Sequence, residues 1–128
     1  IVYTVIGACL LWVGWFGFNA GSALAAGTGA GFAIMVTHLC SATGGFVWMV
    51  VEYLHQGKAS VLGIVSGTVT GLVLVTPMSG FVDHTGAFCS ALIGTPLVYL
   101  GLQFKDRLGY DDALDAFGVH GVGGVLGG

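Results

Sequence analysis

One histidine lies inside an apolar, glycine-rich segment near the end of the chain. Residues 109–124 begin with three acids, Asp111, Asp112 and Asp115, and then become apolar around His120. An ionisable side chain at depth in a bilayer is costly and by default suggests a function. A neutral imidazole can accept one hydrogen bond and donate another, which suits proton relay. The alternative for His120 is a structural role, as a hydrogen-bonded link between helices.

A second group of chemically capable side chains shares one face of the first apolar segment. Trp15, Phe18 or Asn19, and Ser22 are separated by three, four and seven residues, which is helical spacing. An aromatic face attracts a small cation, and a serine oxygen can accept its hydrogen bond. The stripe therefore fits an outer cation site, and it equally fits an interfacial aromatic belt that only packs helices.

Two other kinds of site have weaker support. His38 and His120 both lie in apolar segments and could ligate a haem between helices, so a bis-histidine electron carrier stays open. An intramembrane hydrolase is disfavoured, because Ser22 lies near the outer end of its segment and His120 near mid-depth. The three cysteines have no CxxC spacing, so we expect neither a disulfide nor a metal site: Cys9, Cys40 and Cys89.

The composition indicates an integral membrane protein. Hydrophobic residues make up 55% of the 128 and charged residues 7%, with a mean hydropathy of +0.95, whereas a soluble domain carries about 25% charged residues. The net charge of −3, without a basic cluster, gives no reason to expect nucleic acid as a partner.

These residues must be positioned by membrane-spanning helices. The uncharged runs predict spans at about residues 2–24, 31–54, 60–78, 86–104 and 112–128, the last one incomplete. Lys58, Lys105 and Arg107 fall in the second and fourth connections, which the positive-inside rule assigns to the cytoplasm. His120 then lies roughly 12 Å in from Asp112. Because the chain opens without Met and stops within an apolar segment, we expect a piece of a longer protein.

Glycine spacing predicts close helix packing. The third span carries Gly63, Gly67 and Gly71 at intervals of four, and the first span repeats that spacing at Gly17 and Gly21. Small residues at this interval let membrane helices approach closely.

Three motifs in order along the chain resemble the ammonium transporter (Amt/MEP/Rh) family. They are Gly14-Trp-Phe-Gly-Phe-Asn-Ala-Gly-Ser-Ala23, the turn Val75-Thr-Pro-Met-Ser-Gly-Phe81, and Asp111-Asp-Ala-Leu-Asp-Ala-Phe-Gly-Val-His-Gly121. The resemblance covers nearly the whole chain. It implies an all-α integral membrane fold in which about five helices, the sixth to the start of the tenth, belong to an eleven-helix bundle.

The resemblance also implies roles for particular residues. Trp15 and Ser22 match the family's outer ammonium site, Phe18 matches one of two gate phenylalanines, and His120 matches the second of two pore histidines. Positions expected to support the structure are Asn19, Thr76 and Asp115. The implied function is transport of ammonium or ammonia, with methylammonium as an analogue, by a homotrimer in the plasma or inner membrane, without enzymatic activity, cofactor or metal. A related protein that senses ammonium without net transport is the alternative.

Overall fold

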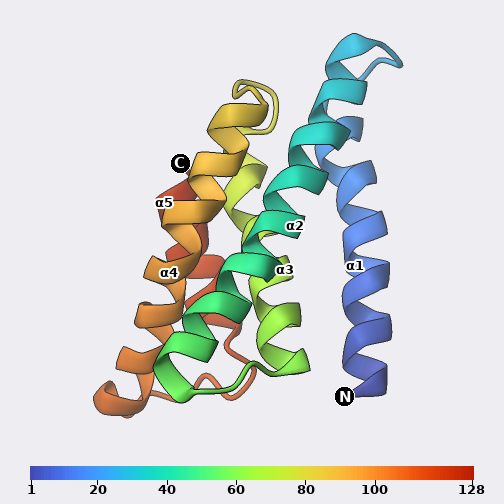
Figure 1. Cartoon of the computed structure of the whole chain (residues 1–128). Coiled ribbons are helices and arrows are strands. Elements are labelled where there is room, and N and C mark those ends of the chain that lie inside the picture. Colours follow the sequence, from blue (N-terminus) through green and yellow to red (C-terminus); the bar gives the residue numbers. More distant parts are fainter.

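The chain folds as a bundle of helices connected by short loops. The computed structural model describes the backbone of residues 1–128 and every side chain except those of residues 106 and 107, so the Arg107 charge used for orientation lies outside the described side chains. The helices are α1 (Val2–Gly21), α2 (Thr28–Gln56), α3 (Val61–Val75), α4 (His84–Leu108) and α5 (Gly123–Gly127), with a 3-10 turn at Thr76–Met78 and a π-helical turn at Gly118–Val122 (Figure 1). Within the described residues, four helices are long and apolar enough to cross a membrane. The chain is thus an all-α, multi-pass membrane protein, as its composition predicts.

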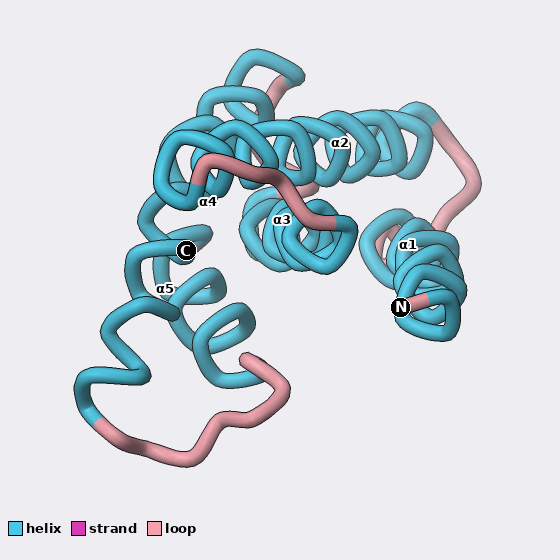
Figure 2. Tube along the Cα trace, turned by 60° about the horizontal axis from the view of Figure 1, so that its bottom comes forward, coloured by secondary structure: helices cyan, strands magenta, loops and turns pink.

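Helix α3 lies at the centre of the bundle. It contacts α1, α2, α4 and α5, and its most extensive interface is with α2. Figure 2 shows α1 at one edge, attached through a loop to α2, with α5 on the opposite side of α3. Only 11% of the apolar window of α1 is buried, against 50% for α2. Helix α1 therefore presents most of its surface outside this bundle.

The glycine ridge of α3 packs as its spacing predicts. A Cβ atom added at Gly67 would lie 2.5 Å from the carbonyl oxygen of Gly44 in α2, and one at Gly71 would lie 2.7 Å from the Cα of Ser41. In α1, no heavy atom of another described segment lies within 4 Å of a Cβ built at Gly17 or Gly21. The two motifs look alike in sequence, but among the described residues the α3 ridge packs against a neighbouring helix and the α1 pair does not, so close packing at Gly17 and Gly21 stays a prediction.

Helix ends follow their capping residues. The hydroxyl of Ser60 accepts a hydrogen bond of 2.9 Å from Gly63 N–H at the start of α3, and Asp83 does the same for Gly86 N–H at the start of α4, at 2.7 Å. Helix α1 ends at Gly21, three residues before the predicted limit, and Leu24 already has a positive φ of 56°. Helix α4 is longer than the predicted span at both ends.

The last helix starts later than the predicted position at Asp112. Residues 112–115 form a turn, and helical backbone begins at Ala116. The carboxylate of Asp112 accepts hydrogen bonds from Phe117 N–H (3.1 Å) and Gly118 N–H (3.0 Å), so it satisfies the first free donors of the helix from outside it. Asp115 has a φ of +55°, which is not helical. The three acids therefore lie ahead of the helix, and Asp112 caps it.

Two polar residues at the predicted cytoplasmic end are more ordered than their positions in sequence indicate. Glu52, near the end of the predicted second span, is only 8% exposed and accepts hydrogen bonds from Ser60 N–H (2.8 Å) and Ser60 O–H (2.9 Å). His55, one residue beyond that predicted span, belongs to α2, and its Nδ1 lies 2.8 Å from the hydroxyl of Tyr99 in α4. Both side chains therefore join helices at this end.

Candidate functional site

His120 lies in the π-helical turn that precedes α5. Its Nδ1 is 3.1 Å from the carbonyl oxygen of Ala116, four residues earlier. A carbonyl can only accept, so in a neutral ring this contact places the proton on Nδ1 and leaves Nε2 as an acceptor. Single π-helical turns occur often at functional sites, because they change the direction in which one side chain points. The imidazole is exposed on the side of the chain that carries Trp15.

The indole ring of Trp15 lies against His120. The ring centroids are 6.3 Å apart with an interplanar angle of 38°. The Nε1–H of Trp15 donates a hydrogen bond of 2.7 Å to the hydroxyl of Thr76, directly after α3. Three segments distant in sequence, α1, the Thr76–Met78 turn and the π-helical turn, thus meet at this point. The sequence places all three residues in motifs but does not indicate that they touch.

A cavity of about 380 Å³ opens beside His120 between α1, α3 and the start of the last helix. Most of its lining is apolar, and its principal polar groups are Thr4, Ser66, Asp115 and His120. An uncharged small molecule would meet little resistance there, whereas a bare cation would lose its hydration with few groups to replace it.

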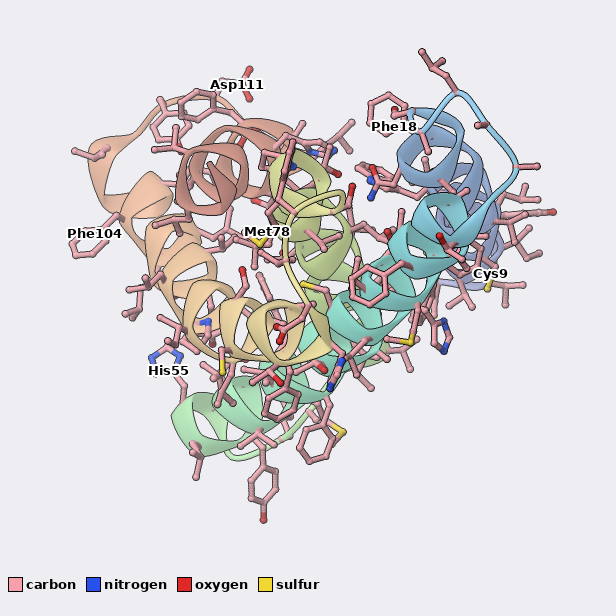
Figure 3. The ribbon with its side chains drawn as sticks, turned by 90° about the horizontal axis from the view of Figure 1, so that it is seen from above. Cys9, Phe18, His55, Met78, Phe104 and Asp111 are labelled. Atoms are coloured by element: carbon pink, nitrogen blue, oxygen red, sulfur yellow. The ribbon has the colours of Figure 1, made fainter. Side chains whose placement is uncertain are left out.

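Phe18 and Ser22 lie further along α1 than Trp15. Phe18 is 61% exposed (Figure 3). Its ring makes an edge-to-face contact with that of Trp15, at 6.3 Å and 76°. The hydroxyl of Ser22 donates to the Phe18 carbonyl oxygen at 2.7 Å, which leaves its lone pairs able to accept. Ser22 is seven residues, or ~10 Å along a helix, beyond Trp15. Phe18 thus contacts Trp15 through its ring and Ser22 through its carbonyl oxygen.

Asn19 connects α1 with α2. Its side-chain amide donates a hydrogen bond of 3.0 Å to the hydroxyl of Thr37, and both side chains are buried. A buried bond between the two helices restricts the rotation of α1 about its axis. It therefore also restricts the direction in which Trp15 and Phe18 of the same helix point. Asn19 thus helps to orient the aromatic side chains of α1.

Asp115 lines the cavity and forms an ion pair with Lys105 of α4. The Lys105 ammonium also donates to the carbonyl oxygen of Asp112 at 2.9 Å. In the sequence, Lys105 indicates only the orientation of the chain in the membrane. Because ten residues and a turn separate it from Asp115, their spacing does not predict that the two side chains meet. The hydrogen bond from Gly118 N–H, helped by Phe117 N–H and by the Lys105 charge, holds the pKa of the Asp112 carboxyl below its ordinary value.

The glycines around His120 differ in what surrounds them. A Cβ at Gly118 would overlap the Leu102 side chain, and one at Gly123 would lie 3.2 Å from Val73. Of these glycines, Gly124 is the one with no neighbour within 4 Å. Gly118 and Gly123 thus let the last helix pack against α4 and α3.

His38 has a different environment from His120. Its ring lies 5.2 Å from the ring of Trp12 and 6.0 Å from that of Phe16, both in α1. The two histidines that a haem would need thus contact different aromatic residues. Among the described side chains, no group of three or more His, Cys, Asp or Glu residues could hold a metal ion.

Comparison with known proteins agrees with the motifs. The Ammonium Transporter Family matches residues 1–128. Ammonium transporter Amt1 of Archaeoglobus fulgidus is 49% identical over 127 residues, which is 99% of this chain and 32% of the relative. The chain thus spans about a third of the relative's length.

Solved structures agree in fold. The crystal structure of Saccharomyces cerevisiae Mep2 superposes with a TM-score of 0.91 and 41% identity, over 96% of this chain and 29% of that one. A structure described as a sensor Amt protein gives a TM-score of 0.92 at 33% identity, over 96% of this chain and 31% of the other. With a family match over every residue and the three motifs packed around His120, the chain belongs to the ammonium transporter family.

Proposed function

We propose that the full-length protein transports ammonium or ammonia across a membrane, and that residues 1–128 form part of its single membrane domain. The observation that carries the proposal is His120, which lines a mainly apolar cavity with its Nε2 left as a hydrogen-bond acceptor. The related Archaeoglobus fulgidus protein is named an ammonium transporter, which supports the same substrate here.

The chemistry of the cavity favours passage of the neutral species. Moving a cation into hydrocarbon costs several kcal/mol, at least ~2.5 on insertion scales, and loss of the proton removes that cost. In the proposed pathway Ser22 recognises ammonium on the outer side, where the serine oxygen accepts a hydrogen bond from an N–H group of ammonium. The ion then passes the gate residue Phe18. Beyond Trp15, His120 assists deprotonation or relays the proton. No catalytic turnover is proposed, and the pathway needs no metal or cofactor.

The remaining parts of the proposal concern the whole protein. We propose a homotrimer in the plasma or inner membrane, with a first pore histidine, a second gate phenylalanine and the rest of the outer site supplied by residues outside this chain. Asn19, Thr76 and Asp115 then serve as supporting residues. The Asn19–Thr37 hydrogen bond and the Asp115–Lys105 ion pair are the contacts that support this assignment for two of them.

Uptake of labelled methylammonium by the full-length protein in transporter-null cells tests the proposal. We expect uptake well above the null cells, and its loss in His120→Ala and Phe18→Ala. His84→Ala is the matched control, because His84 is exposed at the first residue of α4 and lies outside the cavity. Wild-type uptake no higher than in null cells would contradict transport.

A sensing function is the second candidate, because the chain superposes on a sensor Amt protein with a TM-score of 0.92. Uptake of labelled methylammonium into liposomes containing the purified protein separates the two, whether or not charge moves with the substrate. Uptake with wild-type protein and none with His120→Ala supports transport; binding of ammonium without uptake supports sensing. A haem carrier using His38 and His120 would give a Soret band in the same purified sample, and a colourless sample excludes it.

A further inference from the structure

The hydrogen bond that the Thr76 hydroxyl donates is determined by the backbone at the end of α3. Thr76 follows the last residue of α3, and its own N–H bonds to the carbonyl oxygen of Val73 rather than to that of Leu72. The freed Leu72 carbonyl accepts the Thr76 hydroxyl proton at 2.7 Å. The next residue, Pro77, has no N–H that could extend the helix. The end of α3 therefore fixes the direction of the Thr76 O–H bond.

Because the hydroxyl proton is already donated to Leu72, the Thr76 oxygen is left with lone pairs only. Trp15 Nε1–H, which can only donate, points at this oxygen from α1 at 2.7 Å. The end of α3 thus fixes the Thr76 hydroxyl as the acceptor of the Trp15 hydrogen bond, because the hydroxyl proton is held by Leu72. This single bond joins residues 61 positions apart in sequence.

The same indole ring contacts two of the side chains that are proposed to act in the pathway. One contact is with the His120 ring at 6.3 Å, and the other is the edge-to-face contact with Phe18 at 6.3 Å. An indole has two side-chain torsions, and a bond at its far nitrogen fixes both. Loss of that bond would leave the ring free to turn away from His120.

We infer that Thr76 is a positioning residue that holds the Trp15 indole against His120, and so sets the width and shape of the path at the pore histidine. This inference rests on the proposed transport function. Trp15 then acts at the level of His120, in contact both with that ring and with the gate residue Phe18.

The test compares three single substitutions in the full-length protein with wild type. Thr76→Val keeps the side-chain volume and loses the hydroxyl, Thr76→Ser keeps the hydroxyl, and Trp15→Phe keeps an aromatic ring without the N–H. The matched control is Thr70→Val, because Thr70 is fully buried in α3 and its hydroxyl bonds to the Ser66 carbonyl at 2.8 Å in the same way but reaches no indole.

In methylammonium uptake we expect Thr76→Val and Trp15→Phe to lower the maximal rate about fivefold, the effect of one net hydrogen bond, with little change in KM. Thr76→Ser and Thr70→Val should stay near wild type. Adding Thr76→Val to Trp15→Phe should cause no further loss, because both changes remove the same bond. Additive losses, or Thr76→Ser as poor as Thr76→Val, would overturn the inference.

Fluorescence supplies a readout that does not depend on transport. The emission of Trp15 is the difference between the spectra of the purified protein and of its Trp15→Phe variant. The same difference is then measured between Thr76→Val and the double variant Thr76→Val with Trp15→Phe. Compared with the first difference spectrum, this one should lie at shorter wavelength, because the indole N–H has lost its hydrogen-bond acceptor. An unshifted spectrum, or the same shift from Thr70→Val, would overturn the inference even if wild-type uptake is high. A shift in a protein without uptake would retain the positioning role and reject transport instead. If Thr76→Val does not fold, Trp15→Phe still tests the bond from its other end.

Discussion

The side-chain amide of Asn19 donates a hydrogen bond of 3.0 Å to the hydroxyl of Thr37, and both residues are buried between α1 and α2. We expect Asn19→Leu to destabilise the protein by about 0.5–2 kcal/mol, because a buried bond between membrane helices is lost. Thr37→Val should cost a similar amount. Thermal unfolding in detergent of both single variants and of the double variant measures the coupling between the two side chains. Additive losses would mean that the bond does not contribute.

Close packing of α2 on α3 gives a second prediction. Gly71→Ala should destabilise the protein by about 1–3 kcal/mol, because the added Cβ would lie 2.7 Å from the Cα of Ser41 and only movement of backbone could relieve the overlap. Gly101→Ala in α4 is the control, since its Cβ would lie 3.6 Å from Val122, at ordinary contact distance. Yield and melting temperature of the purified variants provide the measurement. Equal stability of the two variants would contradict the α2–α3 packing.

Ser22 provides a prediction about ammonium recognition. Ser22→Ala should raise the concentration for half-maximal methylammonium uptake a few-fold without changing the maximal rate, because it removes a hydrogen-bond acceptor and leaves His120 intact. Ser22→Thr, which keeps the hydroxyl, should behave like wild type. An unchanged half-maximal concentration in Ser22→Ala would remove Ser22 from the outer site.

The capping acid Asp112 makes the last helix sensitive to acid. Gly118 N–H, followed by Phe117 N–H and the Lys105 charge, lowers the pKa of Asp112 in the folded protein. Such a group contributes stability above its unfolded pKa of about 3.9 and loses it as the pH falls through the lower, folded pKa. The melting temperature of Asp112→Asn should therefore lie below that of wild type at pH 7, and the two should converge as the pH falls below about 4. A constant gap between pH 7 and pH 3 would assign the difference to another cause.

Much of the fold could be predicted from the sequence, because a bilayer imposes strong constraints on composition. A span must be long and uncharged, and the nine formal charges of this chain fall almost entirely outside four such runs. Local side chains explain most of the differences at helix ends. The last helix starts after Asp112 and not at it, because the Asp112 carboxylate accepts hydrogen bonds from the N–H groups of Phe117 and Gly118. An aspartate can occupy either a helical or a capping position, and the residue type alone does not decide between them.

The sequence by itself determined the membrane environment, the all-helical fold, the motifs and the candidate residues Trp15, Phe18, Ser22 and His120. Only the tertiary structure decided which of these meet. Helical periodicity places Trp15 and Ser22 on one face, but it does not predict a contact with a residue 61 positions away. The Trp15–Thr76 bond forms because α1 lies beside the end of α3. The same limit applies to glycine, because spacing alone does not distinguish Gly67, which touches α2, from Gly17, which touches nothing within the described chain. Side-chain spacing is a local property, whereas contact between helices depends on their relative positions.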